Sequence, residues 1–214
     1  MSELEAIAEA ARAALEEKNR LRERGLQVQR EVIRTAANAI RAVHRAEYER
    51  ARGMLDQAGR VLATAYDEMA AHPDLRYAGW LQDAEKEYAE AALTLAVMAG
   101  ERLPSPDSLG VGIVPYLNGL GESVGELRRA ILDILRRGEL GRSEELLDTM
   151  DAIYSALVTM DFPDALTGGL RRTTDGVRAI LERTRGDLTV AIRQTMLERT
   201  LNALLENPNR ALGG

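Results

Sequence analysis

The 214-residue chain contains no cysteine and only two histidines, His44 and His72. The lack of cysteine excludes disulfide bonds, cysteine-ligated zinc and thiol nucleophiles. With only two histidines, we do not expect a metal site of two or three histidines and a carboxylate within one chain, and the zincin signatures are absent. Any metal bound by this chain would therefore be held mainly by oxygen ligands.

Aromatic residues are also scarce, at 4% of a chain that is 45% hydrophobic and 29% charged. The core must be built from Ala, Leu, Ile, Val and Met, and the chain is long enough to bury one. No uncharged run reaches the roughly 18–20 residues of a membrane-spanning helix. The acidic first residues lack the apolar centre of a signal peptide. We therefore expect a soluble, cytoplasmic protein with no membrane partner.

Strand-like alternation is missing as well, whereas the strong helix formers Ala, Leu, Glu and Arg dominate. The sequence predicts an all-α fold, a single domain of about six or seven helices over 1–206, followed by a frayed tail at 207–214. Helices are expected at about 3–45, 47–71, 77–100, 114–137, 143–160 and 167–206. Gly25 is a candidate break in the first of them.

Charge is unevenly distributed along a chain whose net charge is -6. Residues 12–60 carry 12 basic and 7 acidic side chains, and one helix face would gather most of the arginines. That face holds Arg30, Arg34, Arg41, Arg45 and, if the helix continues, Arg52, opposite Val28, Val32, Ala36, Ala39 and Val43. It could contact phosphates along a nucleic-acid strand or be an ordinary solvated face.

Acidic residues line two other predicted helix faces. Asp83, Glu87, Glu90 and Thr94 share one face, and Glu87 and Glu90, three residues apart, can point at a single ion. The second face holds Asn118, Glu122, Glu126, Arg129 and Asp133. Two carboxylates from each of two helices suit Mg²⁺ or Mn²⁺, although solvated, salt-bridging acids would give the same pattern.

Glycines accompany the second acidic face, at Gly119, Gly121 and Gly125. A glycine inside a helix costs roughly 1 kcal/mol relative to alanine. Close approach of another backbone would explain this cost, so we expect another helix near Glu122 and Glu126.

Four segments together resemble the translin family over roughly residues 20–195. They are RERGLQVQREVIRTAANAIRAVHR (22–45), EYAEAALTLAVMAGERLPSPDSLG (87–110), VPYLNGLGESVGELRR (114–129) and LRRTTDGVRAILERTRGDL (170–188). The third matches the family's Val-Asp-Tyr-Leu-x-Gly…Gly-Glu-Leu block, with Pro115 in place of Asp. Arg76, Tyr77 and Trp80 match only loosely the basic, histidine-rich nucleic-acid segment of translin itself.

The resemblance implies an all-α protein that assembles into a closed, often octameric shell and binds single-stranded RNA or DNA. It is closer to the translin-associated factor X branch, whose members are Mg²⁺-dependent endoribonucleases. Glu87 and Glu90 match that branch's Glu-x-x-Glu pair, and Glu122 and Glu126 match its second acidic pair. Glu122 stands where the branch usually has Asp, one methylene shorter.

Together these observations favour a homo-oligomeric endoribonuclease that cleaves single-stranded RNA. Glu87, Glu90, Glu122 and Glu126 would be the metal-binding and catalytic residues, with Mg²⁺ or Mn²⁺ as cofactor. Arg30, Arg34, Arg41 and Arg45 would contact the nucleic-acid backbone. A non-catalytic assembly that binds single-stranded RNA or DNA is the alternative, and a helical scaffold without nucleic acid is a third hypothesis.

Overall fold

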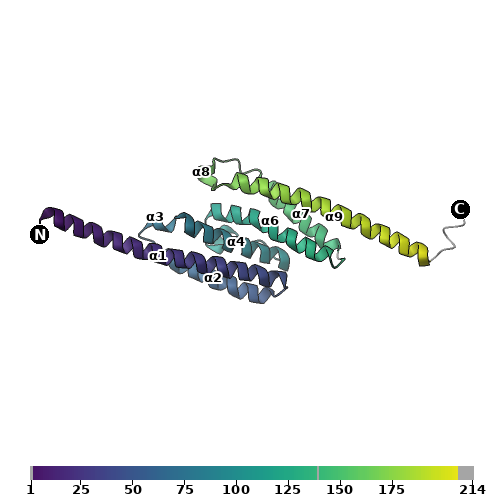
Figure 1. Ribbon diagram of the computed structural model, residues 1–214, viewed down its shortest axis with the longest axis horizontal. Helices are drawn as coiled ribbons and strands as arrows, with labels where there is room; N and C mark the ends of the chain where they lie inside the picture. The colour runs from purple at the N-terminus through teal and green to yellow at the C-terminus, as the bar shows by residue number, and fades with distance from the viewer. Residues whose placement is uncertain (1, 139, 207–214) are drawn as a thin grey trace. The chain divides into compact units, whose positions relative to one another are not determined.

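The computed structural model describes residues 2–138 and 140–206, and the tail predicted at 207–214 lies outside them. The described residues form nine helices and no strand, so the predicted all-α class is confirmed. Six helices are long and three have four residues each (Figure 1). They are α1 (Glu3–His44), α2 (Tyr48–Glu68), α3 (Pro73–Arg76), α4 (Gly79–Ala99), α5 (Pro106–Leu109), α6 (Ile113–Leu135), α7 (Leu140–Leu157), α8 (Asp164–Thr167) and α9 (Leu170–Glu206).

The chain is divided into two compact units. The first combines Met1–Ser123 with Phe162–Leu170, and the second combines Val124–Asp161 with Arg171–Gly214. Helix α6 begins in the first unit and ends in the second. The single domain expected over 1–206 therefore stays a prediction.

Helix α1 is the longest element of the first unit and packs against α2 and α4 (Figure 1). Ser2 caps its start, because the Ser2 hydroxyl accepts a hydrogen bond from Glu5 N and the Glu5 carboxylate accepts one from Ser2 N. The face predicted to be apolar is fully buried, at 0–1% exposure. It consists of Val28, Val32, Ala36, Ala39 and Val43.

The break expected near Gly25 is wrong, since α1 continues through this residue. A Cβ at Gly25 would lie 2.0 Å from Cζ3 of Trp80 and 3.0 Å from Cε of Met69. Glycine therefore makes room for the one tryptophan of the chain. The ring packed against the helix offsets the lower helix propensity of glycine.

Helices α4 and α6 approach each other closely at Gly119, as the glycines of the second acidic face predicted. A Cβ there would lie 2.6 Å from the carbonyl oxygen of Lys86 and 3.0 Å from the amide nitrogen of Glu90. A Cβ at Gly125 would meet no atom within 4 Å, so close approach does not account for that glycine. The contact at Gly119 places the backbone of α6 directly against the acidic turn of α4.

The second unit is stabilised by ion pairs between its own helices. Arg128 on α6 donates hydrogen bonds to Asp187 Oδ2 (2.8 Å) and Thr184 Oγ1 (3.0 Å) on α9. Arg185 on α9 pairs with Asp151 on α7 at 2.8 Å. In neither unit does a described helix have the length and apolar character needed to cross a bilayer.

Candidate metal centre

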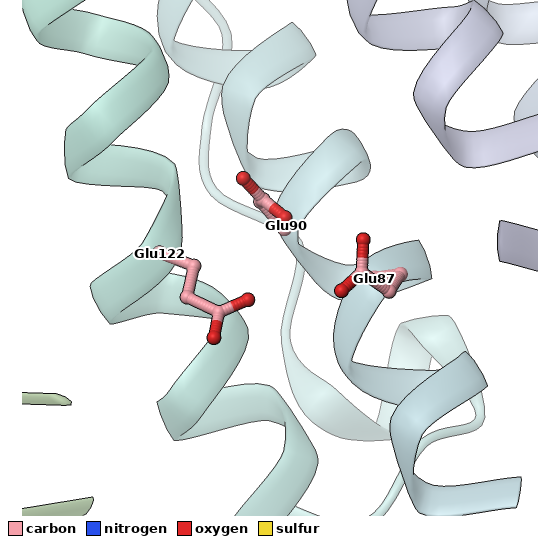
Figure 2. Close-up of side chains that lie close together, drawn as sticks. All are labelled: Glu87, Glu90 and Glu122. Carbon is pink, nitrogen blue, oxygen red and sulfur yellow. The ribbon is translucent and has the colours of Figure 1, made fainter. Parts of the chain in front are cut away.

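Three of the four predicted acidic residues come together between α4 and α6. Glu87 and Glu90 lie one turn apart on α4, and Glu122 lies on α6. Each offers a carboxylate oxygen that is within 4.8 Å of the other two (Figure 2). None of the three side chains is fully exposed to solvent. The cluster lies wholly within the first unit.

The local geometry follows from the sequence of both helices. A spacing of three residues puts Glu87 and Glu90 on the same side of α4. Gly119 lies one turn before Glu122 on α6, and its missing side chain lets the two helices meet. The carboxylate of Glu122 is thereby brought against the acidic turn of α4, from the facing side (Figure 2).

Lys86 lies among these carboxylates. Its Nζ donates a hydrogen bond to Glu122 Oε1 at 2.8 Å and lies 3.5 Å from Glu87 Oε1. Burial on its own would lower the pKa of the ammonium group, but the bond to Glu122 and the charges of Glu122 and Glu87 outweigh it and raise that pKa. Lys86 therefore remains charged and balances part of the acidic cluster. No sequence pattern marks Lys86 as part of the site, although it is one of only two lysines in an arginine-rich chain.

The donor set fits Mg²⁺ or Mn²⁺ on chemical grounds, because all three groups are carboxylates. Oxygens that share one Mg²⁺, each about 2.1 Å away, lie at most about 4.2 Å apart. The carboxylate oxygens of the three residues lie within 4.8 Å of one another, close to this limit. Small rotations of the flexible glutamate side chains are enough to bring them around one ion.

Glu126, the fourth predicted acid, is not part of this cluster of described residues. It lies four residues after Glu122 on α6, within the second unit. There its Oε2 lies 3.7 Å from Nη1 of Arg129. Its role as a metal ligand or catalytic group stays a prediction.

The predicted basic face is present along α1 and at Arg45, which directly follows the helix, and all four of its arginines are exposed. Arg41 donates a hydrogen bond to Asn38 Oδ1 at 2.6 Å, and Arg45 pairs with Glu47 at 2.7 Å. Arg30 and Arg34 complete the face. Arg52 does not continue this face, because α1 ends at His44 and Arg52 lies on α2. There its guanidinium pairs with the Glu101 carboxylate, at a distance of 2.9 Å.

A second polar centre, which sequence analysis also missed, surrounds Glu85 on α4. The Glu85 side chain is 3% exposed. Its Oε1 accepts hydrogen bonds from Tyr66 Oη (2.6 Å) and Arg76 Nη1 (3.0 Å), and its Oε2 accepts one from Gly112 N (2.9 Å). Burial, followed by the Glu85 charge, raises the pKa of Tyr66. The sequence did contain a signal for this burial. Glu85 shares a helical spacing with three apolar residues, Leu81, Tyr88 and Ala92.

This centre explains the segment that matches translin only loosely. The Arg76 guanidinium lies 3.3 Å from the centre of the Tyr66 ring and 5.1 Å from that of Tyr77. Its charge is paired with buried Glu85, and Trp80 packs against Gly25. Arg76 and Trp80 are therefore committed to packing within the first unit.

Known proteins are similar to this chain in sequence and in fold. No protein-family profile matches the chain. The chain is 28% identical to the uncharacterized protein MJ0175 of Methanocaldococcus jannaschii over 189 residues, which is 87% of this chain and 83% of that protein.

Three solved structures of C3PO proteins are similar along nearly their whole length. The structure of AfC3PO with duplex RNA is 32% identical, with a TM-score of 0.82, and covers 88% of this chain and 98% of that one. The crystal structure of AfC3PO is 30% identical, with a TM-score of 0.80, and also covers 88% of this chain and 98% of that one. Apo-NeC3PO, 21% identical with a TM-score of 0.73, covers 89% of this chain and 98% of its own and shares the fold. The C3PO structures are translin-family complexes, and the chain belongs to the translin family.

Proposed function

We propose that this protein is a metal-dependent endoribonuclease that cleaves single-stranded RNA. The observation that carries the proposal is the cluster of Glu87, Glu90 and Glu122, whose oxygens lie within 4.8 Å of one another. These are also three of the positions that match the acidic residues of the nuclease branch. Solvated surface acids would not require two helices to meet at a glycine, as α4 and α6 do at Gly119.

The three carboxylates would hold one divalent cation, Mg²⁺ or Mn²⁺. When bound, such an ion supplies Lewis acidity that activates water and offsets the charge of a phosphoryl oxygen. The chain's own contribution is to fix the carboxylates on two packed helices and limit their contact with bulk water. A carboxylate that does not bind the ion directly can accept a proton from the attacking water.

Contact with the nucleic-acid backbone is proposed for the basic face of α1, formed by Arg30, Arg34, Arg41 and Arg45. These side chains are exposed, and guanidinium groups bind phosphate in a bidentate manner. AfC3PO, a similar protein, has been solved with duplex RNA, which favours RNA as the ligand of this chain too. Single-stranded RNA remains our proposed substrate, and we propose single-stranded DNA as a second ligand.

We also propose a homo-oligomer, for which the family resemblance implies a closed, often octameric shell. Large apolar side chains are exposed near both ends of the described chain. On α1 they are Leu4, Ile7 and Leu15, and on α9 they are Leu197, Leu201, Leu204 and Leu205. Contiguous exposed apolar residues mark interaction surfaces, and a second copy of the chain would cover them.

The deciding experiment is cleavage of an end-labelled single-stranded RNA by the purified protein, with the same sequence as a duplex in parallel. Reactions contain Mg²⁺, Mn²⁺ or EDTA, and the variants are Glu122→Gln and Glu87→Gln/Glu90→Gln. Cleavage should require the metal and fall by roughly 100-fold or more in both variants, because even partners of metal ligands are worth 10–100-fold. Asp83→Asn is the matched control, since Asp83 lies on the same helix but is exposed.

Each other outcome points to a definite alternative. If the RNA is bound but stays intact with either metal, the protein is a non-catalytic RNA-binding assembly. If the Glu variants cleave as fast as the wild type, the cluster is not the active site. Preferential cleavage of the duplex would keep the nuclease but contradict the proposed substrate.

A further inference from the structure

Lys86 has a position that the proposed reaction does not explain. It lies between Glu87 and Glu122, with its Nζ 3.5 Å and 2.8 Å from their Oε1 atoms. Its side chain is only 26% exposed, so it is held at the cluster rather than extended into water. Lysine is rare in this chain, because Lys18 and Lys86 are the only lysines among 28 lysine and arginine residues.

A lysine can occupy this place more readily than an arginine. Its ammonium group is compact, and four flexible methylenes let it leave without movement of the helix. The ammonium carries one charge and lies about 2.8 Å from a carboxylate oxygen, whereas Mg²⁺ carries two charges and lies about 2.1 Å from its ligands. The ammonium and the ion therefore compete for the same oxygens.

We propose that Lys86 is the internal counter-ion of the metal-free cluster and that the divalent cation displaces it from Glu122 and Glu87. This inference rests on the proposed function, because it requires that the cluster bind a metal. It makes Lys86 a residue that sets metal affinity: the ion must break the Lys86–Glu122 hydrogen bond before it can use Oε1 of Glu122. Without the metal, the same bond reduces repulsion among the three acids.

The proposal predicts the opposite of what loss of a purely structural residue would cause. Removing the ammonium group should lower the stability of the metal-free protein but increase its affinity for the metal. Lys86→Met keeps the unbranched side chain up to the position of the ammonium group and removes its charge. Lys86→Gln also removes the charge but can still donate a hydrogen bond, and it serves if Lys86→Met does not fold.

Lys86→Arg and Lys18→Met are the matched controls. Lys86→Arg keeps the charge at the cluster. Lys18 also pairs with a carboxylate, Asp74 at 2.9 Å, but it is 44% exposed and belongs to α1. Lys18→Met thus reports the effect of losing a lysine ion pair elsewhere in the same unit.

The test is titration of the full chain with Mn²⁺, followed by electron paramagnetic resonance of the free ion, and thermal unfolding with and without Mg²⁺. We expect the dissociation constant for Mn²⁺ to fall about tenfold in Lys86→Met, since the loss of one charge-assisted hydrogen bond is of that order. The unfolding midpoint without metal should fall, and the increase caused by Mg²⁺ should grow. Lys18→Met should bind Mn²⁺ as the wild type does.

Failure of this inference can be separated from failure of the proposed function. If the wild type binds Mn²⁺ and both neutral variants bind it equally or more weakly, Lys86 is not a competitor, but the metal site stands. If only the neutral variants bind Mn²⁺, Lys86 is confirmed as the occupant of the cluster. If neither the wild type nor these variants bind Mn²⁺, the metal site fails and the inference fails with it.

Discussion

At the scale of the residue, Glu85 shows how the first unit holds a buried charge. Its carboxylate accepts three hydrogen bonds, from Tyr66, Arg76 and Gly112. A buried carboxylate is tolerated only when it is paired and hydrogen-bonded in this way. Because Gly112 directly precedes α6 and Glu85 lies two residues before Glu87, the network also fixes α6 against the acidic turn of α4.

Glu85→Gln should therefore destabilise the protein strongly. The variant keeps the shape of the side chain but leaves the half-buried Arg76 without its anion. We expect a loss of about 3 kcal/mol in the free energy of unfolding, at the low end for a broken buried pair because Arg76 keeps some access to water. Urea denaturation measures it. Asp83→Asn, an exposed neighbour, should change stability by less than about 0.5 kcal/mol, and an equally small loss for Glu85→Gln would contradict the role of the network.

Individual site residues were predictable only where a pattern marked them. The spacing of Glu87 and Glu90 and the family resemblance of Glu122 identified the three acids that the structure brings together. Lys86 was not predictable as their partner, because adjacent residues of a helix point in different directions and the contact with Glu122 depends on how α4 and α6 pack. Local spacing does not determine that packing.

At the scale of the element, the six long helices match their predicted ranges to within a few residues. Each has a periodic apolar face and ends near Gly, Pro or a polar corner, so local signals were sufficient. The four-residue helices α3, α5 and α8 were not predicted and lie almost entirely between the predicted helix ranges, because so few residues show no periodicity. The mistake at Gly25 has a tertiary cause, the Trp80 ring, which propensity cannot reveal.

Helix α9 has an exposed apolar surface, and we expect a second copy of the chain to bind there. Leu197, Leu201 and Leu204 follow one another at helical spacing, with exposures of 60%, 50% and 46%. Charges placed there would have to be buried in any interface between copies. Leu197→Glu/Leu201→Glu should therefore lower the mass of the particle in solution, measured by light scattering after size exclusion, without unfolding the chain.

The control for this change is Arg199→Glu, which alters the net charge by the same two units. Arg199 is exposed and lies on the opposite side of α9 from these leucines. It should leave the mass unchanged. A wild-type protein that is already monomeric, or a double variant with the wild-type mass, would contradict the proposal that α9 joins copies of the chain.

At the scale of the whole molecule, binding of a polyanion has to overcome a net charge of -6. Charge segregation makes this feasible, because residues 12–60 carry five more basic than acidic side chains and present four exposed arginines on one face of α1. The rest of the chain is acidic and repels nucleic acid. Binding should therefore depend on this face and on ionic strength.

The dependence on salt measures how many arginines of this face touch phosphate. For single-stranded nucleic acid, each phosphate contact adds about 0.7 to the slope of log affinity against log salt. Arg30→Ala/Arg34→Ala should therefore reduce that slope by about 1.4, read by fluorescence anisotropy of a labelled RNA in EDTA so that no cleavage occurs. Arg193→Ala/Arg199→Ala removes the same charge from exposed positions of α9 and should change the slope far less. Equal slopes for the wild type and the α1 variant would show that the basic face is only solvated, and RNA would then have to bind through other residues of the molecule.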